Sequence, residues 1–175
     1  NMLREMEKDI GRLKLVSDRF SKIGSKPQLE KQDLVQTIQQ VVDYVKKRAP
    51  SKVQFNIDLG GQNIIPVLIS PPLFEWVVEN ILKNALDAME GKGNINIQLR
   101  STSAQIVIDI TDTGKGISAV NIRKVFNAGF TTKKRGWGLG LSLSKRIIAQ
   151  YHKGEIFVKQ SEPGKGTTFR IVLKK

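Results

Sequence analysis

Two asparagines, a lysine and an aspartate recur at helical spacing in the stretch 74–89, FEWVVENILKNALDAM. In a helix, Asn80, Lys83, Asn84 and Asp87 would share one side. The apolar residues of the stretch recur on another side, as a core-facing stripe: Phe74, Val77, Val78, Ile81, Leu82, Ala85 and Met89. Because carboxamides are poor helix formers, a solvent face would more often carry Glu and Lys at these positions. The polar side is a candidate binding site, with a solvated surface as the alternative.

The side-chain oxygen of Asn84 is a ligand of the kind that Mg²⁺ accepts. This hard cation keeps several waters and takes other ligands from substrate phosphates. The chain has no cysteine. Disulfides, thiolate metal sites and cysteine nucleophiles are therefore excluded, and any metal site must use oxygen ligands.

Three glycine-rich turns follow this stretch: DTGKGI at 112–117, GWGLGL at 136–141 and EPGKGT at 162–167. Each turn alone is better explained as an ordinary turn, because short motifs match by chance. Asp112 ends a predicted buried strand, where its carboxylate needs a partner such as an exocyclic amine. Gly114 and Gly116 allow the backbone to bend close to a flat ligand. This turn could hold the adenine end of a nucleotide.

Gly136, Gly138 and Gly140 lie where a helix is predicted to begin. Unpaired N–H groups and the helix dipole at such a position attract phosphate. Three cations precede these glycines: Lys133, Lys134 and Arg135. With Asn84, the turns would supply an adenine end, a phosphate end and a metal ligand.

The elements that must position these residues indicate one α/β domain from residue 28 onward. Periodicity and turn residues predict an extended piece at 28–33, helices at 34–47, 74–89, 119–126 and 139–151, and strands at 53–59, 67–70, 95–99, 106–110, 155–160 and 167–173. Asp33 is a suitable N-cap for the first of these helices, and prolines mark the start of the second. We expect a two-layer α/β sandwich with a mixed, largely antiparallel sheet covered on one face by helices.

A separate amphipathic stripe precedes this domain. Apolar residues recur at helical spacing at Leu3, Met6, Ile10, Leu13, Val16, Phe20 and Ile23. The narrow stripe predicts one long N-terminal helix that packs on a partner helix, with folding back on its own domain as the alternative. Gly24 and Pro27 would end the helix in a short linker. We therefore divide the chain into 1–26 and 27–175.

Composition is that of one ordinary domain with an appended element. The 175 residues are 39% hydrophobic, and the net charge is +13, which favours polyanionic partners. Aromatic residues make up only 6% and are not interleaved with the cations, so we expect no nucleic-acid platform. No apolar run approaches the roughly 20 residues of a membrane span, and no signal peptide is recognisable. We expect a cytoplasmic chain, and leave open the anchoring of an intact protein in a membrane.

The order of the motifs resembles the N, G1, F, G2 and G3 boxes of the GHKL ATPase superfamily, which has the Bergerat ATP-binding fold. Five segments carry the resemblance: ENILKNALDA at 79–88, DTGKGI at 112–117, VFNAGFTTKK at 125–134, GWGLGL at 136–141 and GKGTTF at 164–169. They are most similar to the catalytic and ATP-binding domain of bacterial sensor histidine kinases. The resemblance covers roughly residues 28–175 and is specific, because all five boxes occur in the same order.

This resemblance implies ATP and Mg²⁺ as cofactors and assigns roles by residue. Asn84 would coordinate Mg²⁺, with Asn80 and Lys83 near the phosphates as the catalytic residues. Asp112 would accept a hydrogen bond from the adenine amino group, supported by the Thr167 hydroxyl. Residues 126–138 would form the ATP lid. The other implied contacts with the nucleotide are Gly114, Gly116, Ile117, Phe126, Thr131, Thr132, Lys133, Gly136, Gly138, Leu139, Gly140 and Leu141.

Asn80 favours a kinase over a hydrolase. Hydrolytic members of the superfamily typically carry a glutamate at this position as a base for water. The neighbouring Glu79 points about 100° away around the helix, so we interpret it as a partly exposed or structural acid. The alternatives are a GHKL serine-type kinase or ATPase, and a regulatory nucleotide-binding module without kinase activity. A basic nucleic-acid binder ranks last.

The kinase resemblance also gives the N-terminal segment a role. Residues 1–26 are similar to the second helix of a dimerisation hairpin, truncated before the phosphoacceptor histidine. The only histidine, His152, lies in YHKGEI, where the family has a structural turn. The implied partners are ATP and ADP, a response regulator receiver domain, and a second copy that dimerises through the N-terminal helix of the intact protein.

Overall fold

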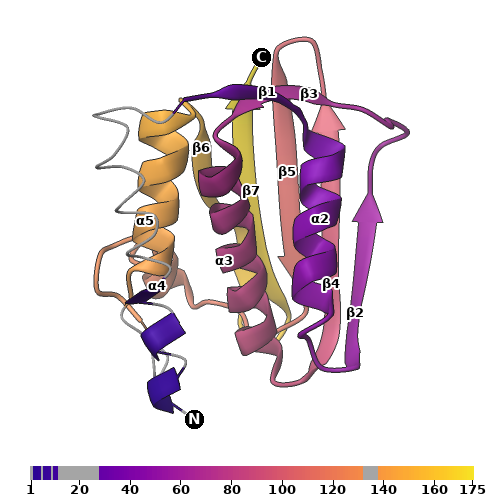
Figure 1. Cartoon of the computed structure of the whole chain (residues 1–175). Helices are drawn as coiled ribbons and strands as arrows, with labels where there is room; N and C mark the ends of the chain where they lie inside the picture. Colours follow the sequence, from indigo (N-terminus) through magenta and orange to yellow (C-terminus); the bar gives the residue numbers. More distant parts are fainter. Residues whose placement is uncertain (1, 5, 9, 12–27, 132–137) are drawn as a thin grey trace.

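The computed structural model describes residues 2–4, 6–8, 10–11, 28–131 and 138–175 (Figure 1). The described residues up to Gly11 are helical. The rest of the predicted N-terminal helix, the linker and the boundary after residue 26 lie outside the described residues, so the single long helix stays a prediction. No described helix is both long enough and apolar enough to span a bilayer.

The main sheet has five strands in the order β2-β4-β5-β7-β6. β2 pairs parallel with β4, and the other neighbours are antiparallel, which confirms the mixed, largely antiparallel sheet. The strands are β2 (Lys52–Asp58), β4 (Lys92–Ser101), β5 (Gln105–Asp112), β6 (Glu155–Glu162) and β7 (Gly166–Lys174).

Helices cover one face of this sheet, as predicted (Figure 1). They are α2 (Leu34–Lys46), α3 (Pro71–Met89) and α5 (Gly140–Arg146), which continues as the π-helix η1 (Ile147–Tyr151). The core lies between the two layers, where Ile95, Ile97 and Leu99 of β4 face the helices and are fully buried. The period-2 pattern of the strand and the helical stripe thus meet in one interface.

A second, two-stranded sheet is formed by β1 (Glu30–Asp33) and β3 (Pro66–Ile69), which pair antiparallel. The sequence predicted both extended segments but not their pairing, which needs a contact across about 35 residues of chain. The carboxylate of Asp33 stabilises this corner. Its Oδ1 accepts hydrogen bonds from Val35 N at 3.1 Å, as the predicted N-cap, and from Ile65 N at 3.0 Å.

Two helical elements differ from the prediction. α4 spans only Ala119–Ile122, whereas helix was expected to residue 126. The chain turns there, which buries Val125 and brings the Phe126 ring edge-on to Phe169 at 6.2 Å. The C-terminal half of the predicted helix 139–151 is a π-helix, which apolar periodicity alone does not distinguish from an α-helix.

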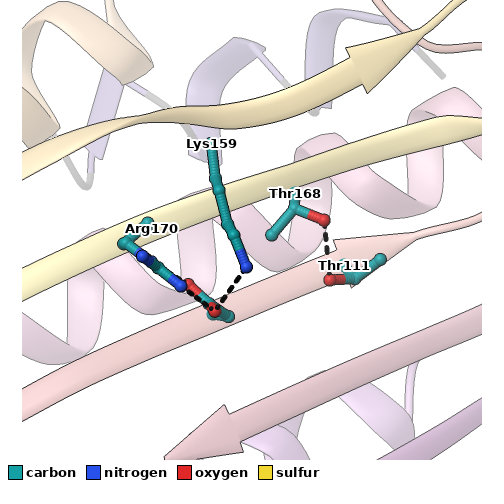
Figure 2. A network of polar contacts seen from close by, with 5 residues as sticks. Thr111, Lys159, Thr168 and Arg170 are labelled. Atoms are coloured by element: carbon teal, nitrogen blue, oxygen red, sulfur yellow. Dashed lines mark hydrogen bonds and ion pairs between the residues drawn. The ribbon is translucent and has the colours of Figure 1, made fainter.

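The other face of the sheet is polar. Asp109 of β5 accepts two hydrogen bonds from Arg170 of β7, at 2.7 and 2.8 Å, and Lys159 lies 3.7 Å from the same carboxylate (Figure 2). Beside them, the hydroxyls of Thr111 and Thr168 are 2.8 Å apart (Figure 2). The hydrogen bonds from Arg170 hold the pKa of Asp109 below its ordinary value of 3.8, against the opposing effect of burial. The ion pair therefore links β5 to β7 across the sheet.

Replacing Arg170 with methionine should lower the free energy of unfolding by about 2 kcal/mol, because it leaves a largely buried carboxylate without its bidentate donor. Urea denaturation at neutral pH measures the loss. Since folding lowers the pKa of Asp109, the stabilisation is present above the ordinary carboxyl pKa. It disappears as the pH falls through the folded value. The difference between the wild type and the variant should therefore shrink in acid.

The matched control is Arg100→Met, which removes the exposed ion pair of Arg100 with Asp58, 2.9 Å long. Exposed pairs contribute little, so this variant should denature close to the wild type. Equal losses of unfolding free energy in the two variants would contradict a larger contribution from the Arg170–Asp109 pair than from an exposed ion pair.

Candidate functional site

α3 has the two faces that the sequence predicted. The stripe that includes Phe74, Val77, Val78 and Leu82 is buried in the core. On the other side, Asn80, Lys83 and Asn84 are half-buried, and Asp87 is exposed. The amide face is therefore covered in part by the protein, which a plain solvent-facing surface would not be.

Asn80 joins α3 to the start of α5. Its Nδ2 donates to Ser144 Oγ at 3.2 Å, and Ser144 Oγ donates to the carbonyl of Gly140 at 2.8 Å. A Cβ on Gly140 would lie 2.5 Å from Asn80 Oδ1, so the backbone of α5 can approach the amide only because residue 140 is glycine. The structure thus brings together two predicted site residues, Asn80 and Gly140. Sequence reasoning missed Ser144, since nothing marks it among the other serines.

Lys83 forms an ion pair with Glu79, which lies one helical turn before it in α3. Its Nζ lies 3.1 Å from Glu79 Oε1, and the Glu79 side chain is 17% exposed. This agrees with the prediction that Glu79 is a structural acid. A phosphate at Lys83 would share the ammonium group, which has three N–H donors, with the Glu79 carboxylate.

Asp112 occupies a buried position at the end of β5, as predicted. Its Oδ1 accepts a hydrogen bond from Gly114 N at 2.8 Å. Burial raises the pKa of Asp112, and backbone hydrogen bonds from Gly114 and Thr167 oppose that shift. A carboxyl group with this cost of ionisation is the kind of group that binding sites retain.

The glycine turn after Asp112 is bonded to two neighbouring elements. Lys115 N donates to the carbonyl of Ala88 at the end of α3 over 2.9 Å. The carbonyl of Lys115 in turn accepts from Gly164 N, in the turn between β6 and β7, at 2.7 Å. The three segments therefore form one junction.

Ser161 is a second link in this junction, and sequence reasoning missed it. Its Oγ accepts from Ile117 N at 2.7 Å and lies 2.7 Å from the hydroxyl of Thr167. Thr167 pairs with Asp112 across β5 and β7. The predicted site residues Asp112, Ile117 and Thr167 are thus brought together. Only the pairing of β6 with β7 brings Ser161 to them, so no local signal could have found it.

The glycines of the junction serve close packing of the protein on itself. A Cβ on Gly114 would meet the carbonyl oxygen of Ala88 at 2.6 Å. One on Gly116, whose φ is +75°, would overlap the carbonyl of Glu162, and one on Gly166 would overlap that of Asp112. The structure therefore adds a packing role to the ligand-approach role that the sequence suggested for Gly114 and Gly116.

The two ends of the predicted lid are joined. Gly129 N donates to the carbonyl of Gly138 at 2.9 Å, and Gly138, with φ +66°, packs on the backbone of Gly129 and Phe130. Phe126 and Leu141 are half-buried, and Thr131 and Leu139 are exposed. The predicted contacts Thr132, Lys133 and Gly136 lie outside the described residues.

The ligand types that the described residues offer to Mg²⁺ are limited. Within 28–131, 138–175 and the described part of the N-terminus, no three His, Cys, Asp or Glu residues cluster as a metal cage. A side-chain amide such as that of Asn84 is a ligand type that suits Mg²⁺, a cation that takes most of its ligands from water and phosphate.

The polar face of the sheet also holds a hollow of about 390 Å³. Its lining includes Asn56, Asn96, Thr111 and Thr168, none of which belongs to the glycine turns. Because successive residues of β5 point to opposite faces, Thr111 lines this hollow while Asp112 points to the helices. The hollow is separate from the candidate site.

Gly116→Ala should unfold far more easily than Gly164→Ala. Both positions have a left-handed backbone, with φ of +75° and +81°, so each substitution costs about 1 kcal/mol in backbone strain. A Cβ at 164 meets nothing within 4 Å, whereas one at 116 overlaps the Glu162 carbonyl. Overpacking should therefore cost Gly116→Ala roughly 2 kcal/mol more in chemical denaturation. Equal stability of the two variants would show that the junction is not tightly packed.

Sequence comparison connects this site to known proteins. Residues 70–175 match the family described as histidine kinase-, DNA gyrase B- and HSP90-like ATPase. The chain is 36% identical over 156 residues to sporulation kinase E of Bacillus subtilis, covering 86% of the chain and 21% of that protein. It is 40% identical over 124 residues to the signal transduction histidine-protein kinase AtoS of Escherichia coli, covering 70% and 20%. The chain spans about a fifth of the length of these curated relatives.

Solved structures show the same fold. The catalytic domain of histidine kinase ThkA superposes with a TM-score of 0.77 at 23% identity, covering 85% of this chain and 96% of that one. ThkA in complex with the response regulator protein TrrA gives a TM-score of 0.75 at 21% identity, over 97% and 49%. With the family match across residues 70–175, the chain belongs to the histidine kinase-, DNA gyrase B- and HSP90-like ATPases.

Proposed function

We propose that this chain is the ATP-binding catalytic region of a two-component sensor histidine kinase. It would transfer the γ-phosphoryl group of Mg-ATP to a histidine that lies outside these residues. The observation that carries the proposal is the amide at Asn80, bonded to Ser144 beside the predicted phosphate turn. An amide cannot take a proton from water, so this position supports transfer to an external nucleophile rather than hydrolysis.

Each end of the site would bind one part of ATP. The ionised carboxylate of Asp112 would accept a hydrogen bond from the adenine amino group. Gly114 and Gly116 would leave room for the adenine ring. The backbone of Gly138, Leu139 and Gly140 would meet the phosphates. Binding both ends at once orients the terminal phosphoryl group, which is the main contribution of a protein to phosphoryl transfer.

Charge neutralisation would come from α3. Asn84 would hold Mg²⁺, which supplies positive charge between the phosphates. Lys83 would add a second positive charge on release from Glu79. In the reaction the bond from the γ-phosphorus to the β–γ bridging oxygen breaks, and that oxygen leaves with ADP. The unprotonated nitrogen of the acceptor imidazole forms the new bond to phosphorus, and the proton on the other ring nitrogen passes to solvent. Nothing in this exchange requires a general base at residue 80.

The partners follow from the same proposal. A phosphohistidine made by this region would pass its phosphoryl group to a response regulator receiver domain, and ThkA has been solved with such a protein. The N-terminal segment would dimerise the intact protein, so that the domain reaches a histidine on a helical hairpin. Use of ATP as substrate supports a cytoplasmic location.

Phosphoryl transfer can be tested in trans. The chain is incubated with γ-labelled ATP, Mg²⁺ and a separate hairpin domain that carries the acceptor histidine. We expect label on the hairpin that is lost in acid and retained in base, as a phosphoramidate requires. Asn84→Ala should abolish labelling and remove the Mg²⁺ dependence of ATP binding in calorimetry. Mg-ATP binding without any transfer would instead favour the regulatory nucleotide-binding module.

Asp112→Asn should lose affinity for Mg-ATP without losing stability. The amide oxygen can keep the bond from Gly114 N, and the cost of burying a charge disappears, so unfolding at pH 7 should be no easier than in the wild type. Because folding raises the pKa of Asp112, the charge penalty is largest above the folded pKa and is relieved as pH falls toward the ordinary value of 3.8. The stability difference between the two proteins should therefore narrow in acid.

The same variant should lose most of its affinity for Mg-ATP, because an amide can turn a donor toward the adenine amino group. Asp58→Asn, at an exposed carboxylate on the other sheet face, is the matched control and should bind like the wild type. Unchanged affinity in Asp112→Asn would remove Asp112 from the adenine site.

A further inference from the structure

We propose that His152 is a positioning residue for the nucleotide, because it pins the start of α3 to the end of the α5–η1 helix and so sets the gap between them. This inference rests on the proposed function, since α3 carries Asn80, Lys83 and Asn84 and α5 begins at the predicted phosphate turn. His152 would act through its contacts with Ser70 and Phe74 at the start of α3, and not by touching the nucleotide.

Both ring nitrogens of His152 have backbone partners. Nδ1 lies 3.0 Å from the carbonyl of Ile147 and must donate to it, which leaves Nε2 free of hydrogen. Nε2 accepts a hydrogen bond from Ser70 N at 3.1 Å. The residue is buried, and the Phe74 ring lies 5.7 Å away at 59°. Burial lowers the pKa of His152, against a smaller opposing effect of the Ile147 carbonyl, so the neutral ring is the folded form. The sequence-based expectation of a structural histidine agrees with these contacts.

The start of α3 depends on this contact to an unusual degree. Its first two residues are Pro71 and Pro72, which carry no N–H. Ser70, the N-cap residue, makes no side-chain cap hydrogen bond. The backbone N–H of Ser70 bonds instead to the ring of His152, the residue that follows η1.

The π-helix places the ring at this position. His152 N bonds to the carbonyl of Ile147 at 3.3 Å, five residues back, and Gly154 N bonds to Ile148 at 2.9 Å. π-turns are rare and often occur at functional sites. The wide turn lets one carbonyl, that of Ile147, bind both the backbone N–H and the ring of His152. The ring orientation is thereby fixed relative to α5.

A second tie joins the middle of α3 to the first turns of α5. Asn80 bonds to Ser144 and packs against Gly140, whereas Ser70 bonds to His152. The order of these contacts shows that α3 and α5–η1 run antiparallel. Ser70 and Asn80 are about 15 Å apart along α3, and Ser144 and His152 about 12 Å along α5–η1. Two stiff segments of similar length are thus tied at both ends.

Loss of the His152 tie removes the hydrogen bond between the start of α3 and the end of η1, and leaves the contacts of Asn80 and the apolar packing that includes Ile147 and Ile148. The start of α3 is then less restrained relative to η1, which shifts Asn84 relative to the backbone at 138–140. A site that binds Mg²⁺ and phosphates from two helices loses affinity when their separation varies, even though every contact group is still present. Because His152 and the phosphate turn lie at opposite ends of one helix, the effect acts over distance.

Calorimetry with Mg-ATP tests the proposal, at a temperature where every variant is folded. His152→Ala should bind on the order of 10-fold more weakly than the wild type. His152→Gln can present an oxygen to Ser70 N and should recover part of that loss. The control is Leu99→Ala, at a fully buried residue of β4 that β5 and β7 separate from β6, which should unfold more easily than the wild type yet bind Mg-ATP normally.

Amide hydrogen exchange gives a readout that needs no nucleotide. In His152→Ala, exchange should speed up at Phe74, whose N–H bonds to Ser70, and at Leu143, whose N–H bonds to Leu139 at the start of α5. Leu99→Ala should leave the ratio of the exchange rates at these two amides to the rate of global unfolding unchanged. Wild-type affinity in His152→Ala, or protection at Leu143 equal to that of the wild type, would overturn the proposal. Failure of the wild type to bind Mg-ATP would overturn the proposed function instead.

Discussion

The hydrogen bond from Lys115 N to the carbonyl of Ala88 connects α3 to the first glycine turn, and the site depends on it. A carbonyl near a helix C-terminus lacks a partner within the helix, so an outside donor stabilises it. That donor can approach only because Gly114 has no side chain to strike Ala88. One backbone contact thus satisfies the end of α3 and sets the position of the turn that follows Asp112.

Glycines allow similarly close contacts in the rest of the site. Gly140 allows α5 to reach Asn80, Gly116 allows the first turn to reach the β6–β7 turn, and Gly138 closes the base of the predicted lid. Between these contacts lies Asp112, a carboxyl that burial makes costly to ionise. Tight backbone packing and an unfavourable charge are opposite contributions to stability. Their combination is expected where a protein sacrifices stability for a preorganised binding site.

The two faces of the sheet carry different kinds of stabilisation. On the helix side, Ile95, Ile97 and Leu99 are buried against apolar stripes, so the hydrophobic effect sets which residues face inward. On the other side, Asp109 and Arg170 join β5 to β7 by a bidentate ion pair. Since Asp112 and Thr167 lie three residues along the same two strands, the ion pair also maintains the register at the candidate site.

Local patterns in the chain were enough to predict α2, α3, the strands, the two faces of α3 and the layered architecture, because apolar period and turn residues act over a few positions. They also marked Asp112 and the glycine turns, and the resemblance of the motifs to the GHKL superfamily added Thr167. They could not reveal Ser144, Ser161 or the π-turn before His152. Each of these depends on contacts between residues far apart in sequence: Asn80 with Ser144, Ser161 with Ile117, and His152 with Ser70. The residues that flank a serine or a histidine in the sequence do not show whether its side chain belongs to a site. Only the packing of α3 against α5 and of β6 against β7 decides which hydroxyls and which imidazole become part of this one.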